Sequence, residues 1–183
     1  MQQTEPNRQE APPLGELTAL HFPEPQKMLF DNGLTCYFLA TQEPDVVVLE
    51  MIFGAGCWHE TQAKVAEITG LMLLEGTTEM TGQDLLEKIE YFGASINVKS
   101  YNDFAKISIH TLSKYLSDLL PLLKKILTDS KFGQSDFDKL IKNRQQKLLV
   151  KEGKLEYLAD VMFHEKLFGE GHPYGYRPTA DQY

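Results

Sequence analysis

The sequence is poor in cysteine and lacks the groupings that mark a zinc finger. Cys36 and Cys57 are the two cysteines among 183 residues, and neither belongs to a Cys-x-x-Cys pair or a histidine-rich tract. The chain also lacks an apolar run long enough to cross a bilayer, so no membrane span is predicted. It lacks the charged start and apolar core of a signal peptide. These absences favour the cytoplasm, with the periplasm as the alternative if a leader has been removed.

An excess of positive charge is missing as well. The formal net charge is −8, whereas a nucleic-acid-binding protein needs a basic patch to displace counterions from phosphates. One stretch, 131–154, is locally basic, through Lys139, Lys142, Arg144, Lys147 and Lys151. At helical spacing this run indicates the solvated face of a helix. We therefore expect no nucleic acid among the partners.

Two common catalytic motifs are absent. There is no Gly-x-Ser-x-Gly elbow of a serine hydrolase. The glycines of Gly54–Gly56 lack the Lys-Ser/Thr and the spacing of a phosphate-binding loop. The function must therefore come from other features of the chain.

The pattern along the chain predicts one α+β domain after a proline-rich leader. Residues 1–26 are rich in proline and polar residues and are predicted to be disordered; residues 27–183 form the domain. Within it, strands are expected at 45–53, 94–100 and 104–112, and helices at 61–76, 81–93, 115–127, 135–152 and 154–168. This order favours a largely antiparallel sheet with helices packed on one side.

Local signals predict a hairpin before these elements and sharpen three of them. Asn32-Gly33 between apolar runs predicts a β-hairpin. The 45–53 segment is apolar on both faces, as in a central strand covered at least partly on each side. Thr61 is predicted to cap the first helix and Gly76 to close it. Thr81 and Asp84 form a capping-box pattern for the second helix.

Several short motifs, in a fixed order, carry a family resemblance. They are Asn-Gly-Leu at 32–34, Gly-Ala-Gly at 54–56, Glu-Gly-Thr at 75–77, Gly-Ala-Ser-Ile-Asn at 93–97 and Leu-Phe-Gly-Glu-Gly-His-Pro-Tyr-Gly at 167–175. In this order and spacing the sequence resembles the insulinase/pitrilysin family of zinc peptidases, the inverted HxxEH zincins. The resemblance spans about Phe30 to Thr179, and the fold it implies, a pitrilysin-like metallopeptidase-homologue domain, agrees with the α+β prediction.

The resemblance also implies that the zinc motif has been lost. Counted back from Gly76-Thr77, the first His position of HxxEH holds Glu67, the general-base position Gly70 and the second His position Leu71. These vestigial positions share one helix face at i, i+3 and i+4. The family's third ligand, a Glu, comes from a later helix, in the region 142–151. No carboxylate occurs from Lys139 to Lys151.

A catalytic zinc site needs about three protein ligands and an open water position. Gly70 and Leu71 donate nothing, so we expect no catalytic residue, no metal and no cofactor in this chain, with zinc confined to active homologues. The histidines His21, His59, His110, His164 and His172 are scattered without metal spacing. An active zinc peptidase with atypical ligands is a further alternative.

A scaffold without its ligands resembles the non-catalytic half of a two-part clamp. We expect this chain to pair with an active homologous subunit, or with a second domain of the same full-length protein, and to help enclose an extended peptide. A second hypothesis is a stand-alone peptide-binding or assembly module. In the family, the strand corresponding to 93–100 offers its edge to substrate, which implies contacts from Ala94, Ser95, Ile96, Asn97, Val98 and Lys99. The alternative to peptide binding is that the 93–100 strand is simply paired within the sheet.

Full-length members of the family carry two related domains and extend past the His-Pro-Tyr-Gly turn. The resemblance therefore implies that this domain is truncated at its C-terminal end. Missing elements would uncover an edge or a face of the sheet. We expect such a fragment to form homodimers.

Overall fold

The computed structural model describes residues 22–40 and 45–183. Most of the expected leader, including His21, lies outside the described residues. The chain divides into two units between Pro44 and Asp45. The predicted domain start at Lys27 therefore falls inside the first unit.

The described part of the first unit is a β-hairpin. Strand β1 (Gln26–Leu29) pairs antiparallel with β2 (Thr35–Phe38). The turn between them places Gly33 at φ +83°, a conformation that glycine adopts without strain. The Asn32 side-chain oxygen accepts a hydrogen bond from the Leu34 amide at 3.0 Å. The hairpin predicted from Asn32-Gly33 is therefore confirmed.

The second unit contains a three-stranded antiparallel sheet. Its strands β3 (Val46–Phe53), β4 (Ser95–Ser100) and β5 (Ala105–Leu112) lie in the order β3-β5-β4. The expectation that 45–53 is a central strand is wrong for this sheet, because β3 lies at an edge. Val46, Val48 and Ile52 are 53%, 49% and 66% exposed on its outer face. The apolar residues on both faces of β3 predicted that both faces are covered, but no residue within 45–183 covers the outer face.

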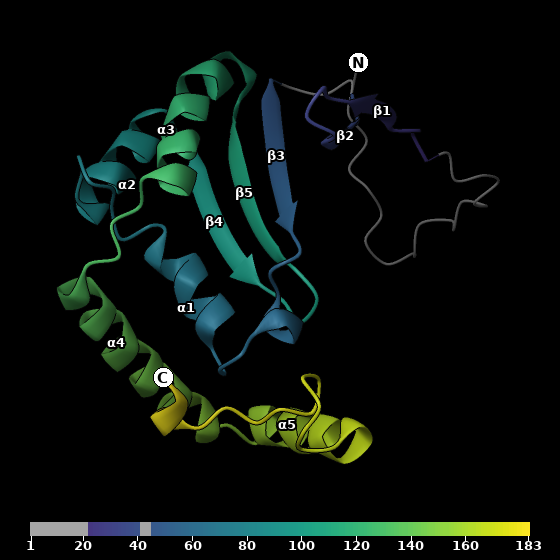
Figure 1. Ribbon diagram of the computed structural model, residues 1–183, viewed down its shortest axis with the longest axis vertical. Helices are drawn as coiled ribbons and strands as arrows, with labels where there is room; N and C mark the ends of the chain where they lie inside the picture. Colours follow the sequence, from purple (N-terminus) through teal and green to yellow (C-terminus); the bar gives the residue numbers. More distant parts are fainter. Residues whose placement is uncertain (1–21, 41–44) are drawn as a thin grey trace, which may run out of the picture. The chain divides into compact units, whose positions relative to one another are not determined.

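Helices cover the opposite face of the sheet, as Figure 1 shows. Helices α2 (Gly82–Tyr91) and α3 (Leu116–Thr128) pack their apolar stripes on β4 and β5. The buried core comprises Leu85, Ile89, Ala94, Val98, Ile107, Ile109, Leu119, Leu122, Leu123 and Ile126. Helix α1 (Val65–Met72) lies against β4.

The last two helices are attached to α1 and to each other. Helix α4 (Gln134–Glu152) contacts α1, and α5 (Leu155–Phe168) contacts α4 (Figure 1). Three short 3₁₀ turns, η1 (Cys57–His59), η2 (Ser113–Tyr115) and η3 (Ala180–Gln182), complete the fold. None of the helices in the described part of the chain is both long and apolar enough for a membrane crossing.

The start of α2 agrees with its predicted cap, whereas the start of α1 does not. The Thr81–Asp84 capping box opens α2 as predicted. The predicted Thr61 cap is wrong: α1 begins at Val65, after Lys64 in the left-handed region at φ +72°. The Glu60 carboxylate, not Thr61, accepts the amides of Lys64 and Ala66, at 3.0 and 2.8 Å.

The predicted end of the first helix is also misplaced. Helix α1 ends at Met72, before the predicted stop at Gly76. Gly76 does have a positive φ, +130°, but it forms an isolated bridge with Thr81 and does not close α1.

Candidate functional site

The three vestigial motif positions lie on α1 and have three different environments. Gly70 is buried against β4, whereas Glu67 and Leu71 are half-buried. A Cβ atom placed on Gly70 would lie 2.9 Å from Cγ1 of Val98, closer than carbon atoms approach without a shift. Helix α1 and strand β4 are therefore in contact at Gly70, the position at which an intact HxxEH motif has its general-base Glu.

Glu67 is held by two cations. The Lys64 Nζ lies 3.0 Å from Glu67 Oε2, and the Arg144 guanidinium lies 3.6 Å from Oε1. The Tyr183 hydroxyl approaches Oε2 at 3.5 Å. Glu67 is therefore a paired helix carboxylate. These contacts also join α1 to α4, since Arg144 belongs to α4.

The ion pair with Glu67 favours the charged form of Lys64. Burial by itself would lower the pKa of Lys64, but the Glu67 carboxylate and Tyr183 outweigh that effect, so the pKa is raised above its ordinary value. The ammonium also lies 5.2 Å from the ring centre of Tyr183 and 5.8 Å from that of Tyr176. Lys64 is therefore charged at neutral pH, beside the face that would have to accept a metal ion.

A pocket of about 240 Å³ opens between α1, α4 and α5, beside Glu67. Helix α4 contributes Arg144, Lys147, Leu148 and Lys151 to its wall. These residues come from the region in which the third ligand is expected, and none carries a carboxylate. Among the residues that the structure describes, no group of three or more His, Cys, Asp or Glu side chains could hold a metal ion. One carboxylate surrounded by cations does not fit Zn²⁺, which needs N, S or O donors.

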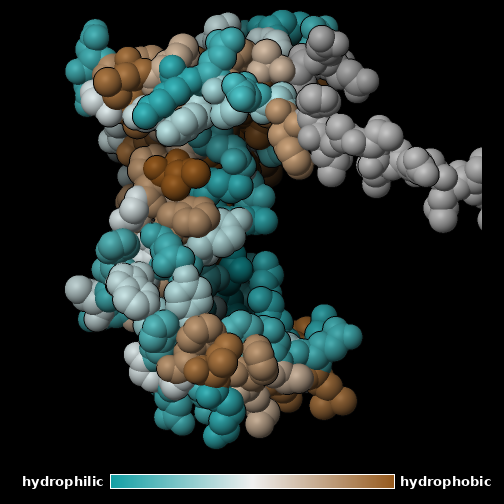
Figure 2. All heavy atoms as spheres, turned by 90° about the vertical axis from the view of Figure 1, so that its right-hand side faces the viewer, coloured by the Kyte–Doolittle hydropathy of each residue, from teal (hydrophilic) through white to brown (hydrophobic). Residues whose placement is uncertain are grey.

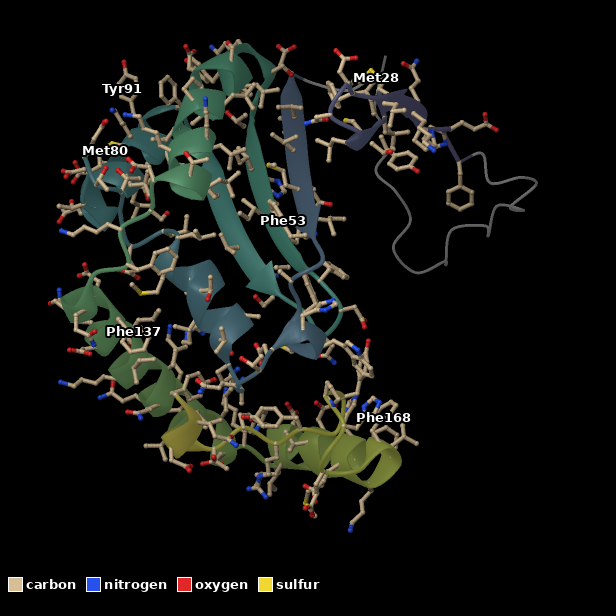
Figure 3. All side chains as sticks on the ribbon, viewed as in Figure 1. Met28, Phe53, Met80, Tyr91, Phe137 and Phe168 are labelled. Carbon is tan, nitrogen blue, oxygen red and sulfur yellow. The ribbon has the colours of Figure 1, made fainter. Side chains whose placement is uncertain are left out.

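The structure brings together histidines that the sequence leaves scattered. The rings of His164 and His172 both stack on the Phe168 ring, with centroid distances of 6.1 and 5.4 Å. Trp58 meets His172 edge-on at 5.4 Å. Figure 3 labels Phe168 near the end of α5, where the chain turns back. The cluster ties the His-Pro-Tyr-Gly turn to α5 and η1 by aromatic packing.

The predicted peptide-binding residues divide between a strand and its approach. Ser95, Ile96, Asn97, Val98 and Lys99 lie in β4, and Ala94 precedes it with its amide bonded to the Ile89 carbonyl at 3.2 Å. β4 pairs with β5, and no second strand neighbours it within residues 45–183. It is therefore an edge strand in the described sheet.

The register shows which backbone groups of β4 point outward. The Tyr101 amide donates to the Phe104 carbonyl at 2.8 Å, so these two residues form a hydrogen-bonded pair. Because such pairs alternate along an antiparallel ladder, the backbone groups of Ser95, Asn97 and Lys99 face β5. Those of Ile96, Val98 and Ser100 face the open edge.

The end of this edge lies beside the vestigial motif. The Ser100 hydroxyl donates to the Ala66 carbonyl of α1 at 2.8 Å. Ala66 immediately precedes Glu67. A peptide strand added to β4 would therefore pass close to the pocket.

The cations around Glu67 are the functional feature that sequence reasoning missed. Lys147 and Lys151 are exposed, as expected for a solvated helix face, whereas Arg144 is half-buried; their spacing of three and four residues places all three on one side of α4. That spacing was the available signal. What it could not show is that this side of α4 turns toward α1.

The comparisons with known proteins agree with this geometry. The family profile described as Insulinase (Peptidase family M16) matches residues 38–172. A curated Helicobacter pylori protein named non-peptidase homolog YmxG is 26% identical over 115 residues, which cover 63% of this chain and 27% of that protein. The chain thus spans about a quarter of that relative's length.

Two solved structures share the fold. A peptidase M16 inactive domain from Pseudomonas fluorescens has a TM-score of 0.75 at 23% identity, over 84% of this chain and 38% of that chain. A protease from Helicobacter pylori has a TM-score of 0.74 at 15% identity, over 85% of this chain and 38% of that chain. With a family profile that matches well over half of its residues, the chain belongs to the insulinase family, peptidase family M16.

Proposed function

We propose that this chain is a catalytically inactive zinc-peptidase homologue that pairs with an active homologue and helps to enclose a peptide. The partner is a separate subunit or a second domain of the same full-length protein. The observation that carries the proposal is the ion-paired Glu67 on a helix that otherwise presents Gly70 and Leu71. The scaffold of a peptidase is kept while the chemistry that it would support is removed.

The residues around α1 oppose zinc binding in two ways. Glycine and leucine offer no donor atoms, and the single carboxylate is already neutralised by Lys64 and Arg144. A divalent cation would have to displace these two charges and then remain close to them, at a Coulomb cost of about 2–8 kcal/mol for each of the two cations at roughly 4 Å in a wet site. Without the metal, water is not activated, and no general base replaces the one missing at position 70.

Exposed apolar surface supports pairing with another protein. Figure 2 shows hydrophobic residues gathered at the end of the molecule formed by α5. Helix α5 exposes Met162, Phe163 and Leu167 by 54%, 62% and 60%. Permanent interfaces are more apolar than the rest of a protein surface. This face of α5 is the contact surface that we assign to the partner.

The names of the similar proteins support the same proposal. One relative is called a non-peptidase homolog, one neighbour an inactive domain and another a protease. Proteins with and without activity thus share this fold. A division of labour between an active and an inactive half accounts for the retention of an inactive one.

Mixing experiments test the pairing. The chain, an intact-HxxEH homologue from the same organism and their mixture are compared by light scattering, elemental analysis and cleavage of a quenched peptide. We expect no zinc and no cleavage from the chain alone, a defined complex in the mixture, and faster cleavage than by the homologue alone. Tightly held zinc with chelator-sensitive cleavage by this chain alone would revive the active-peptidase alternative and overturn the proposal.

A matched pair of variants locates the contact surface. Phe163→Glu places a charge in the apolar face of α5, and we expect it to weaken the complex at least tenfold. Gln83→Glu makes the same change of charge at an exposed position of α2 and should leave the affinity within about twofold. Equal affinities for both variants would remove the α5 surface from the proposal.

A stand-alone peptide-binding module is the second candidate. The outward backbone groups of Ile96, Val98 and Ser100 favour it, because an open strand edge can bind an extended peptide by β-augmentation. Titration with an unstructured peptide should give saturable binding. N-methylation of every second peptide amide should abolish the binding when the methylated amides are those that face β4, and should leave it unchanged when they are the amides in between. Absence of saturable binding, or equal loss for both sets of amides, would contradict pairing along β4.

A further inference from the structure

The pocket beside Glu67 is lined by an excess of positive charge. Lys64, Arg144, Lys147 and Lys151 contribute four cations to its wall, and Glu67 is its one carboxylate. Within the described residues, Lys147 and Lys151 make no ion pair within 4 Å, whereas Lys64 and Arg144 share Glu67. The formal excess is therefore three positive charges around a cavity of about 240 Å³.

Nearby carboxylates do not cancel this excess. Glu60 accepts the amides of Lys64 and Ala66 at the start of α1. Glu152, at the end of α4, lies 3.9 Å from the guanidinium of Arg177. Neither carboxylate lines the pocket, and Glu152 is paired with Arg177.

We propose that this pocket binds an oxyanion, supplied either by the carboxylate of an acidic peptide or by a phosphate. An oxyanion relieves the repulsion among the four cations, as Glu67 does in part. Arg144 is suited to the task because a guanidinium donates to two oxygens of one carboxylate or phosphate at once. Its contact with Glu67, at 3.6 Å, is longer than a hydrogen bond, so its donors are available to a ligand.

The size of the pocket and its neighbourhood agree with such a ligand. At roughly 30 Å³ per water molecule, 240 Å³ accommodates one oxyanion and several waters. Tyr157 and Tyr183 line the same pocket, and the Tyr183 hydroxyl, 3.5 Å from Glu67 Oε2, can donate hydrogen bonds. The Ser100–Ala66 hydrogen bond places the end of β4 beside α1. A peptide along β4 would thus bring an acidic side chain within reach.

The proposal predicts an unusual response to the loss of a charge. Glu67→Gln keeps the size of the side chain but frees Lys64 and Arg144 from their carboxylate. If Glu67 competes with the ligand, the variant should bind an anion several-fold more tightly. If the anion were instead attracted non-specifically by charge over the whole surface, Glu67→Gln would change its affinity much less.

The experiment uses the chain alone, at constant ionic strength with chloride as the replaced anion. The probes are inorganic phosphate and two extended peptides of one sequence, containing either glutamate or glutamine. Amide shifts of α1 and α4 in NMR titrations report binding. The pocket variant is Lys147→Gln with Lys151→Gln, and the control is Lys142→Gln with Lys166→Gln, which removes the same charge at exposed positions outside the pocket.

We expect saturable binding that weakens at least tenfold in the pocket variant and stays within about twofold in the control. Saturation by the glutamate peptide but not the glutamine peptide identifies the peptide carboxylate as the source; saturation by phosphate alone identifies phosphate. No saturation by any probe, or equal weakening in both double variants, overturns the proposal. Because no partner or cleavage is involved, these outcomes are distinct from a failure of pairing.

Discussion

Replacing Gly70 with alanine tests whether α1 is closed against β4. The new Cβ would lie 2.9 Å from Cγ1 of Val98, while its 3.6 Å distance to the Ser100 hydroxyl is an ordinary contact. Val98 is buried, 8% exposed, and a β-branched side chain has few alternative rotamers. The helix or the strand must therefore shift to admit one methyl group.

Two opposing effects set the size of the change. Alanine is favoured over glycine inside a helix by about 1 kcal/mol, whereas overpacking a core costs about 1–3 kcal/mol. Gly70→Ala should therefore lower the free energy of unfolding by about 1 kcal/mol. Gly153, at the end of α4, has φ −74° and meets no atom closer than 3.5 Å, so Gly153→Ala should raise it by about 0.4–1 kcal/mol.

Urea denaturation of both variants measures this contrast, and the melting temperatures should differ by several degrees for a chain of this length. Val98→Ala supplies an internal check, because it removes the atom that clashes. In that background Gly70→Ala should no longer be destabilising, which gives a favourable coupling energy in the double-mutant cycle. Gly70→Ala as stabilising as Gly153→Ala in the wild-type background would refute the close packing of α1 on β4.

Three further predictions concern α1 and α2. Glu60→Ala should cost about 0.5–2 kcal/mol of unfolding free energy, the range for a lost helix cap, while Thr61→Ala should cost under about 0.5 kcal/mol; the reverse order in urea denaturation would restore the threonine as cap. Hydrogen bonds from Thr81 lower the pKa of Asp84, so the stabilising contribution of Asp84 is present above its unfolded pKa of about 3.9 and is lost as pH falls through the lower folded pKa. In the Thr81→Ala variant, NMR titration should show the pKa of Asp84 returning toward about 3.9. An unchanged pKa would disprove the cause. Restoring HxxEH on α1 by three substitutions should not yield stoichiometric zinc by elemental analysis after gel filtration, whereas one retained zinc per chain would contradict the charge argument.

Much of the fold follows from local sequence signals. Asn32-Gly33 specifies the hairpin because few other residues tolerate its turn. Thr81 and Asp84 open α2 through bonds made within one turn of chain. In each case the deciding contacts join residues close together in the sequence, so the pattern alone is sufficient.

The errors arise where distant residues decide the outcome. Apolar residues on both faces of β3 predicted a covered central strand, but the number of neighbours depends on which other strands are present. The start of α1 depends on Glu60, which accepts an amide six residues away, a longer reach than the capping patterns describe. The Glu67–Arg144 pair joins residues 77 positions apart and requires the tertiary fold.

The loss of zinc chemistry is therefore more than a change of three residues. At position 70 a side chain is excluded by Val98, so a general base cannot be restored without moving β4. At position 67 the carboxylate is committed to Lys64 and Arg144, and removing it would leave two cations facing each other. On α4 the pocket wall carries Arg144, Lys147 and Lys151 and no carboxylate. Because these three changes lie on two neighbouring helices, α1 and α4, reversal at any one of them leaves the other two in place, which favours a lasting non-catalytic role for the scaffold.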